Sequence, residues 1–187
     1  CYREVLRLAR DNAAEISHRY PKVLRRVGGY NLDAFVDASR PVDMTRLIVG
    51  SEGTLAAILE ARVNLVPLPA AKAVMAIQFA DLLESLEATP AILEHRPSAV
   101  EVMDRFILDN TKQNASHDRL RRTFIDGEPG ALLCVEFYAD HAEDLPPRRD
   151  ALERDLRARR LGYRYHRAID LAAQARIWSL REAALGL

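Results

Sequence analysis

The sequence predicts an α+β fold in two parts. After Val74, short apolar runs typical of strands alternate with stretches in which apolar residues recur every three or four positions, as in helices packed on a sheet. The strands are short enough for an antiparallel or mixed sheet. Pro67 and Pro69 precede this alternation and predict a boundary, which we place between a first domain of residues 1–68 and a second domain of residues 69–187.

The first domain is predicted to begin with a helix that ends at Pro21. The apolar face of this helix is formed by residues three and four positions apart: Leu6, Ala9, Ala13, Ile16 and Tyr20. Gly28 and Gly29 then form a loop that enters a short helix, and residues 36–46 form an exposed polar excursion. From residue 57 to residue 65, apolar and polar side chains alternate, which predicts a half-buried strand.

The second domain is predicted to alternate strands and helices in the order βαβαβαβα. The strands are expected at residues 73–80, 98–104, 131–139 and 163–169. The helices are expected at residues 81–96, 105–113, 146–160 and 170–185. Asp81 is the first residue of the segment 81–96, and Asp104 directly precedes the segment 105–113; at both positions a carboxylate can cap free backbone N–H groups.

Composition and charge exclude several classes of function. The 27 acidic and 27 basic residues leave no excess of positive charge, so no nucleic-acid partner is expected. No apolar run approaches the ~20 residues of a membrane-spanning helix, and no signal peptide precedes the first helix, so we expect a cytoplasmic protein without a transmembrane segment. Cys134 lies in an apolar run and is expected to be buried and reduced. The five histidines show no i, i+4 pair, so no metal site is expected within this chain.

The stretch LIVGSEGTL, residues 47–55, is the strongest candidate for chemistry. A nucleophile elbow needs a glycine where Val49 stands, and a dinucleotide fingerprint needs three glycines. A nucleic-acid G-x-x-G clamp would bring Glu52 against phosphates, which it would repel. Two interpretations remain open: a loop at the start of a helical turn whose N–H groups face an anionic or polar ligand, and a plain turn between two elements.

A family resemblance narrows these interpretations. The segments GGYNL, residues 28–32, and RLIVGSEGTLAAILEARVNLVPLP, residues 46–69, resemble the end of the FAD-binding domain in FAD-linked oxidases of the vanillyl-alcohol oxidase type. Within that group, D-lactate, glycolate and D-2-hydroxyglutarate dehydrogenases are the most similar. The resemblance continues through PSAVEVMD, LLCVEF and IWSLREA. It implies that residues 1–68 end an FAD-binding domain and that residues 69–187 form a ferredoxin-like βαβ cap domain that binds substrate.

The same resemblance implies roles for particular residues. The residues that would contact FAD are Gly29, Tyr30, Gly50, Ser51, Glu52, Gly53 and Thr54. Arg181 would anchor the substrate carboxylate, because a guanidinium offers two parallel donors to a carboxylate; the alternative is a surface arginine paired with Glu182. Trp178 is expected in the core, and the alternative is a position in the wall of a substrate pocket. Glu136 needs a partner if it is buried, and an arginine is expected rather than a metal. Glu101 is expected to have a structural role, and no catalytic role is predicted for it.

The implied function is oxidation of a 2-hydroxy acid by hydride transfer to FAD. Cys1 in place of an initiator methionine, and no stop signal beyond Gly186, predict a fragment of a longer enzyme, which alone would bind FAD weakly or not at all. The catalytic base is expected outside the fragment. The long excursion between Phe35 and Arg46 resembles variants fused to an iron-sulfur domain, which would accept the electrons. The alternatives are a non-enzymatic interaction module and a flavoenzyme of the same fold that acts on an alcohol, phenol or sugar.

Overall fold

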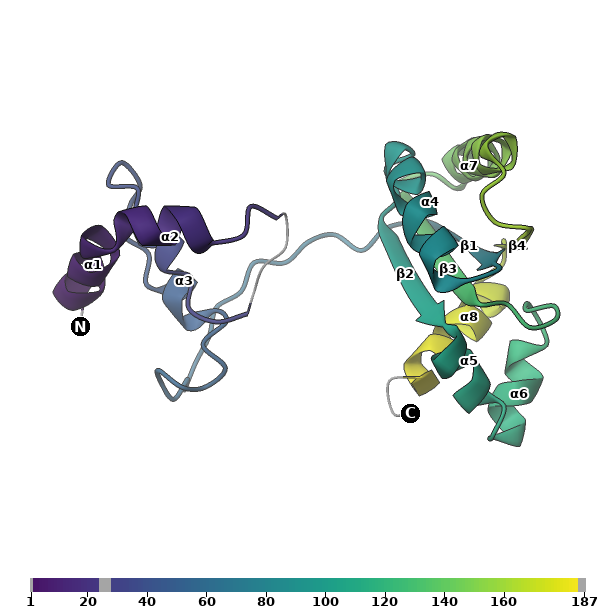
Figure 1. Cartoon of the computed structure of the whole chain (residues 1–187), viewed down its shortest axis with the longest axis horizontal. Coiled ribbons are helices and arrows are strands. Elements are labelled where there is room, and N and C mark those ends of the chain that lie inside the picture. Colours follow the sequence, from purple (N-terminus) through teal and green to yellow (C-terminus); the bar gives the residue numbers. More distant parts are fainter. Residues whose placement is uncertain (1, 24–27, 185–187) are drawn as a thin grey trace. The chain divides into compact units, whose positions relative to one another are not determined.

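The computed structural model describes residues 2–23 and 28–184, and the chain divides into two compact units, residues 1–65 and 66–187. Figure 1 labels their elements. The two units differ in secondary structure. The first holds short helices, and the second is built on a four-stranded sheet.

In the first unit, the predicted opening helix is present but is interrupted at Asn12. It forms α1, Tyr2–Asp11, and α2, Ala13–Arg19. The short helix predicted after the glycine loop is the 3₁₀ helix η1, Leu32–Phe35, and α3, Thr45–Ile48, follows the polar excursion. The core of this unit is small and consists of Ala9, Phe35 and Leu47, with a few half-buried neighbours.

The strand predicted over residues 57–65 is not formed. This segment carries no regular structure, and its side chains are exposed, with Leu59 98% and Leu65 90% accessible. A period of two specifies a strand only where a second strand supplies backbone partners and a core covers one face. Within the described residues, no strand pairs with this segment.

The second unit is α+β, as predicted. Its strands are β1, Ala71–Phe79; β2, Ala99–Asp104; β3, Ala131–Ala139; and β4, Arg164–Ala168. They form an antiparallel sheet in the order β2-β3-β1-β4, so the two long strands are central and the two short strands lie at the edges. β3 lies between β1 and β2, which is the split βαβ arrangement of ferredoxin-like folds.

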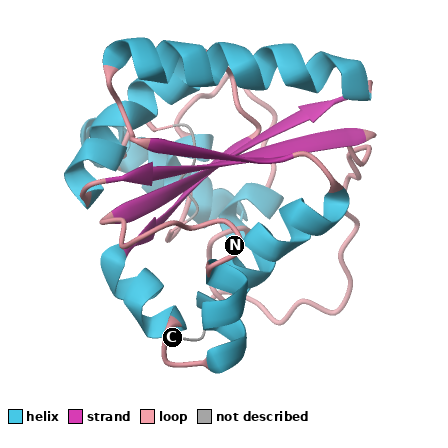
Figure 2. Cartoon of the chain, turned by 90° about the vertical axis from the view of Figure 1, so that its right-hand side faces the viewer, coloured by secondary structure: helices cyan, strands magenta, loops and turns pink. Residues whose placement is uncertain are grey.

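Helices cover both faces of this sheet (Figures 1 and 2). α4, Leu82–Glu94, and α7, Leu145–Arg159, pack on one face around Met75, Phe79 and Phe137. α5, Arg105–Thr111, and α8, Leu171–Ala184, pack on the other face. Since both faces are covered, β1 and β3 are buried along most of their length. Cys134 is free and fully buried, as predicted, and burial raises the pKa of its thiol to about 12.

The predicted caps of α4 and α5 are confirmed. The Asp81 carboxylate accepts a hydrogen bond from the Glu84 N–H at 2.9 Å, and the Asp104 carboxylate accepts one from the Ile107 N–H at 2.9 Å. The sequence interpretation missed α6, Ala115–Arg121, which packs on α8. Asn114 caps it by accepting a hydrogen bond from the Ser116 N–H at 2.8 Å, and this asparagine was the signal in the sequence.

Candidate functional site

The glycine turn of the first unit, residues 50–54, follows the C-terminal end of α3. Of the two interpretations left open by the sequence, the one that places this stretch at the start of a helical turn is therefore wrong, and the positive end of a helix dipole is not available to it. Gly50, Glu52 and Gly53 have positive φ angles of 88°, 51° and 75°. A left-handed conformation costs a residue with a Cβ about 1–2 kcal/mol, so Glu52 is held there by its surroundings.

The glycine turn is closed by its own hydrogen bonds. The Ser51 N–H donates to the Ile48 carbonyl at 3.1 Å, and the Thr54 N–H donates to the Ser51 carbonyl at 3.0 Å. The Thr54 hydroxyl reaches the same Ser51 carbonyl at 2.6 Å, and the Ser51 side chain is buried. Because these two N–H groups are already bonded, they are not free to bind a phosphate.

Tyr30 and the glycine turn lie side by side, as the resemblance implies. The Tyr30 hydroxyl and the Thr54 hydroxyl are 2.8 Å apart. The Asn31 amide donates to the Val49 carbonyl at 2.9 Å and to the Arg46 carbonyl at 3.1 Å, so it joins the GGYNL segment to the end of α3. Two segments about twenty residues apart in sequence thus form one surface of the first unit.

At two positions of this surface the backbone conformation favours glycine, although a larger side chain would meet no steric obstacle. Gly29 has a φ angle of 85° and Gly53 one of 75°, and a Cβ added at either would meet no atom within 4 Å. The space outside both glycines is therefore open. A hollow of about 320 Å³ adjoins Gly29 and is also lined by Tyr20 and Tyr30. Open space beside bare backbone fits the close approach of a dinucleotide such as FAD.

A second candidate site lies in the second unit, where α8 ends over one face of the sheet. It is a cleft of about 340 Å³ lined by Lys72, Ala99, Glu101, Glu136, Tyr138, Trp178, Arg181 and Glu182. Three strands contribute to it through residues on the same face, since Lys72 is opposite Tyr138 and Ala99 is opposite Glu136 in the strand registers. Trp178 packs against the core and also lines the cleft, so its environment combines the predicted core position with the alternative position in a pocket wall.

Arg181 pairs with Glu101 and not with its helix neighbour Glu182. The Nε–H of Arg181 donates to the Glu101 carboxylate, which comes from β2, and each of these two side chains is 34% exposed. The structure thus brings together two residues 80 positions apart. The pair therefore joins Arg181, the predicted substrate anchor, to Glu101, for which the sequence analysis predicted no catalytic role.

Glu136 has a different partner from the predicted one. Its carboxylate is buried, and its interaction with Tyr138, two residues along β3, raises the pKa of the Tyr138 hydroxyl. In residues 2–23 and 28–184 no arginine forms an ion pair with Glu136, so the predicted arginine is replaced by a tyrosine. The Lys72 ammonium lies 5.1 Å from the centroid of the Tyr138 ring, a cation–π distance.

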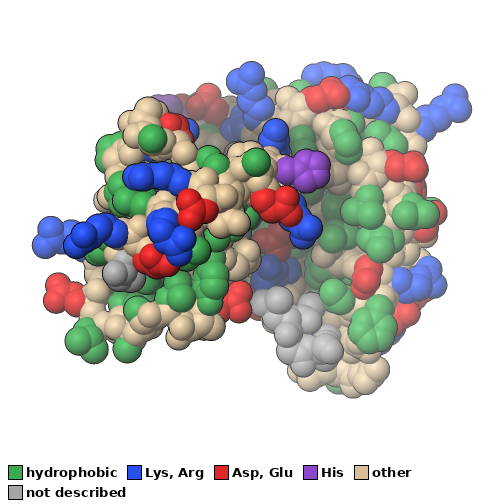
Figure 3. Space-filling model, turned by 60° about the vertical axis from the view of Figure 1, so that its left-hand side comes forward, with side chains coloured by type: hydrophobic (Ala, Val, Ile, Leu, Met, Phe, Trp, Pro, Cys, Tyr) green, Lys and Arg blue, Asp and Glu red, His purple; other side chains and the backbone are tan. Residues whose placement is uncertain are grey.

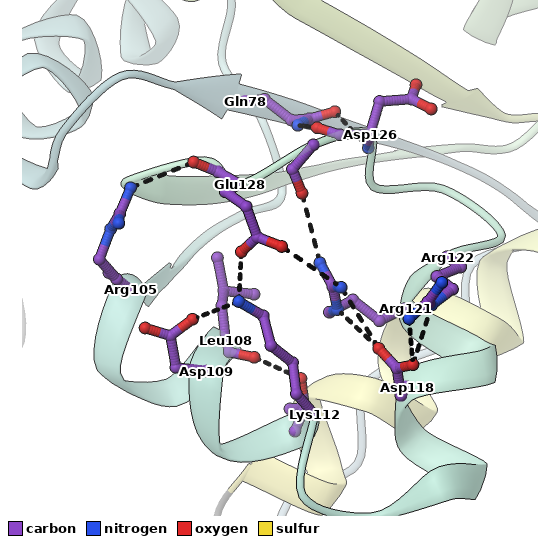
Figure 4. A network of polar contacts seen from close by, with 12 residues as sticks. Gln78, Arg105, Leu108, Asp109, Lys112, Asp118, Arg121, Arg122, Asp126 and Glu128 are labelled. Atoms are coloured by element: carbon purple, nitrogen blue, oxygen red, sulfur yellow. Dashed lines mark hydrogen bonds and ion pairs between the residues drawn. The ribbon is translucent and has the colours of Figure 1, made fainter.

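A polar network at the other end of β1 was not found from the sequence (Figure 4). The buried Gln78 amide donates to the Asp126 carbonyl at 2.7 Å and accepts from the Asp126 N–H at 3.1 Å. The Glu128 carboxylate forms an ion pair with the Lys112 ammonium, and one of its oxygens lies 3.8 Å from a guanidinium nitrogen of the buried Arg121. These contacts hold the loop before β3 against α5 and α6. They are explained by loop placement alone.

The surface carries no large area of a single charge on the face drawn in Figure 3, where acidic and basic side chains are interspersed. No group of three or more histidine, cysteine, aspartate or glutamate side chains in the described ranges is arranged to hold a metal ion. None of the helices described is long and apolar enough to cross a membrane.

The fold and the cleft define a ferredoxin-like α+β domain with a charged cleft at one end of its sheet. Comparison with known families is more specific, because residues 68–187 match the family described as FAD linked oxidases, C-terminal domain. The chain belongs to this family. The match covers most of the second unit, including β1 to β4 and Arg181.

The chain is also similar to curated proteins named D-2-hydroxyglutarate dehydrogenase. It is 32% identical to the one from Pantoea ananatis and 30% identical to the one from Escherichia coli, in both cases over all of this chain. The protein of the same name from Pseudomonas putida is 25% identical over 98% of the chain. The chain spans only 19% of the length of these relatives.

Proposed function

We propose that this chain is part of a longer flavoenzyme that oxidises a 2-hydroxy acid. The observation that carries the proposal is the position of Arg181, whose guanidinium lines a cleft at the end of the sheet in a domain of the FAD linked oxidase family. The names of the similar proteins support a 2-hydroxy acid as substrate, and the length of those proteins supports a longer enzyme.

In this proposal, Arg181 binds the substrate carboxylate through parallel N–H donors. This contact fixes the orientation of the neighbouring α carbon, from which hydride leaves, and orientation of this kind lowers the barrier by removing freedom of motion before reaction. When bound, FAD would supply the acceptor for this hydride. No residue of this chain is assigned as the base that takes the hydroxyl proton.

FAD would be contacted by one surface of the first unit. The residues proposed for it are Gly29, Tyr30, Gly50, Ser51, Glu52, Gly53 and Thr54. The open space beside Gly29 and Gly53 supports close approach of a cofactor. Because the Ser51 and Thr54 N–H groups are used within the turn, we expect contact through backbone surface and the remaining groups, and not through these two donors.

The proposal extends to the organisation of the protein. Residues 1–68 end the FAD-binding domain, and residues 69–187 are the substrate cap. The electron acceptor is proposed to be an iron-sulfur domain of the same polypeptide, which the long excursion before Arg46 supports. A cytoplasmic location and the absence of a nucleic-acid partner stay predictions of the sequence.

The direct test is expression of the longer polypeptide that contains this chain. We expect it to carry flavin absorbance that bleaches when a 2-hydroxy acid is added without oxygen. Arg181→Ala should raise KM for the hydroxy acid by about 10- to 100-fold, the equivalent of about one charge-assisted hydrogen bond. A lysine in its place should recover part of this loss, because it keeps the charge but not the planar donor pair.

Arg159→Ala is the matched control. Arg159 also pairs with a glutamate of another element, Glu94, at 2.6 Å, but it lies on α7, which covers the opposite face of the sheet. KM should not change in this variant. If the longer polypeptide carries no flavin, the non-enzymatic alternative is favoured. If it oxidises an alcohol, phenol or sugar and Arg181→Ala leaves KM unchanged, the carboxylate role is wrong.

A further inference from the structure

The ion pair between Glu101 and Arg181 has a particular geometry. Glu101 accepts from the Nε–H of Arg181, which is the side of the guanidinium nearest its aliphatic stem. An arginine has five N–H donors, and the other four belong to its two terminal nitrogens. The bond to Glu101 therefore fixes the plane of the group while the end of the guanidinium remains for a ligand in the cleft.

The charges of the cleft make this orientation important. Two cations, Lys72 and Arg181, line it together with three acids, Glu101, Glu136 and Glu182. The cleft therefore has no excess of positive charge to attract an anion. Binding of a carboxylate there must depend on well-aligned N–H donors, since a bidentate pair is strong only when its planes match.

The two partners are also held by different parts of the fold. Glu101 lies in β2, opposite the buried Cys134 of β3, so its backbone position is set by the sheet. Arg181 lies in the last turn of α8 and follows the buried Leu180. The bond between them connects the end of a helix to a strand and leaves the long arginine side chain with fewer conformations to lose on binding.

We propose that Glu101 is a positioning residue that orients the Arg181 guanidinium toward the substrate carboxylate. This proposal rests on the proposed function and assigns a role to the glutamate of the VEVMD segment. Glu101 does not touch the reacting atoms; it acts through Arg181.

The test uses the flavin-loaded longer polypeptide and variants at both positions. Glu101→Ala removes the acceptor, whereas Glu101→Gln keeps an oxygen at the same place without the charge. We expect Glu101→Ala to raise KM for the 2-hydroxy acid by about tenfold or more, and Glu101→Gln to stay within about threefold of the unchanged protein. Rescue by glutamine indicates orientation, because the amide oxygen can still accept from Nε–H.

A double-mutant cycle separates positioning from a structural role. Once Arg181 is replaced by alanine, adding Glu101→Ala should leave KM where it is, because Glu101 has no arginine left to orient. Glu94→Ala, which breaks the pair with Arg159 on the other face of the sheet, is the matched control and should leave KM unchanged. The thermal midpoint of every variant shows whether the fold is retained.

The outcomes are distinct. If Arg181→Ala raises KM and Glu101→Ala does not, or lowers it, the positioning role is overturned and the proposed function stands. An equal effect of Glu101→Ala with and without Arg181 also overturns positioning. If the polypeptide oxidises no 2-hydroxy acid, or if Arg181→Ala leaves KM unchanged, both proposals fail together.

Discussion

The two units of this chain bury their apolar side chains to very different extents. Residues 66–187 bury a core on each face of the sheet, with Phe79, Phe137 and Ile177 fully inaccessible. Residues 1–65 have one small core. The segment after it leaves large apolar side chains such as Leu59 in water. The difference teaches that the second unit contains the interactions that fold it, whereas the described residues of the first unit provide no surface that covers its apolar segment.

The largest effect should come from separating the units. Residues 66–187, produced alone, should fold cooperatively with a free energy of unfolding in the range of about 5–15 kcal/mol that is usual for single domains. Residues 1–65 alone should show no cooperative transition, because their small core does not offset the conformational entropy of the chain. Circular dichroism during urea titration measures both, and a sigmoidal transition in the short piece would remove the contrast.

A smaller effect is expected from one core substitution in each unit. Phe137→Ala should lower the free energy of unfolding of the second unit by about 3–5 kcal/mol, since it removes a fully buried ring. Phe35→Ala, in the core of the first unit, should leave that free energy unchanged. Trp178 is the single tryptophan and lies in the second unit, so its fluorescence reports this unit selectively.

An equal shift of the Trp178 transition in both variants would show that the two units unfold as one. That outcome would contradict the contrast between them.

Two glycines provide a finer comparison. A Cβ at Gly130 would lie 2.1 Å from the Ala80 carbonyl oxygen, so Gly130→Ala should destabilise the second unit by about 1–3 kcal/mol. A Cβ at Gly53 would meet no atom, so Gly53→Ala carries only the strain of a φ angle of 75°, about 1–2 kcal/mol within the first unit.

The readouts for these two glycines differ as well. Gly130→Ala should shift the Trp178 unfolding transition. Gly53→Ala should leave that transition in place and, in the longer polypeptide, reduce retention of flavin on a desalting column. Full flavin retention in Gly53→Ala would argue against this glycine as part of the cofactor surface.

The smallest expected effect is a pH dependence confined to the second unit. Burial lowers the pKa of His166 below its ordinary value of 6.5, and the charges of Arg176 and Arg164 act in the same direction. The unfolded chain therefore binds a proton more readily than the folded one, so stability should be full above pH 6.5 and decrease as the pH falls through the lower folded pKa.

The check on this pH effect is the urea midpoint of the Trp178 transition, measured against pH in the unchanged chain and in His166→Asn. Asp126 raises the pKa of the same ring, although less than burial lowers it. Phe124 packs beside the ring at 5.9 Å between centroids, so the asparagine variant will be less stable at every pH. The predicted difference is a flatter slope below pH 6.5, and an unchanged slope would assign the pH dependence to other groups.

The sequence predicted the second unit well because its signals are local. Short apolar runs marked its four strands, and the Asp81 and Asp104 carboxylates marked two helix starts. α6 was missed because its neighbours are polar and its apolar face is narrow. The prediction of a strand at residues 57–65 was wrong, because alternation of apolar and polar side chains does not show that a second strand is present to bond with the backbone.

The candidate sites depend on contacts that a sequence does not contain. Arg181 was proposed from the family resemblance of the IWSLREA segment, but its partner Glu101 is 80 residues away. The sequence interpretation expected an arginine beside Glu136, but the neighbouring side chain is Tyr138. The two residues are neighbours because they are two positions apart on β3 and so lie on the same face of the sheet. Local sequence identifies the residue type that can bind a ligand, whereas the tertiary fold decides which neighbours orient it.

The edges of the sheet have a consequence for self-association. β2 and β4 are the short strands, and among the residues that the structure describes no further strand pairs with their outer edges. β4 carries Arg164 and Arg167, and β2 carries Glu101 and Asp104. Ion pairs within the domain offset most of these charges, since Arg164 pairs with Asp126, Arg167 with Glu153 and Glu101 with Arg181. The shortness of the two edge strands, which offer few backbone groups to a second copy, is therefore the feature that disfavours edge-to-edge pairing.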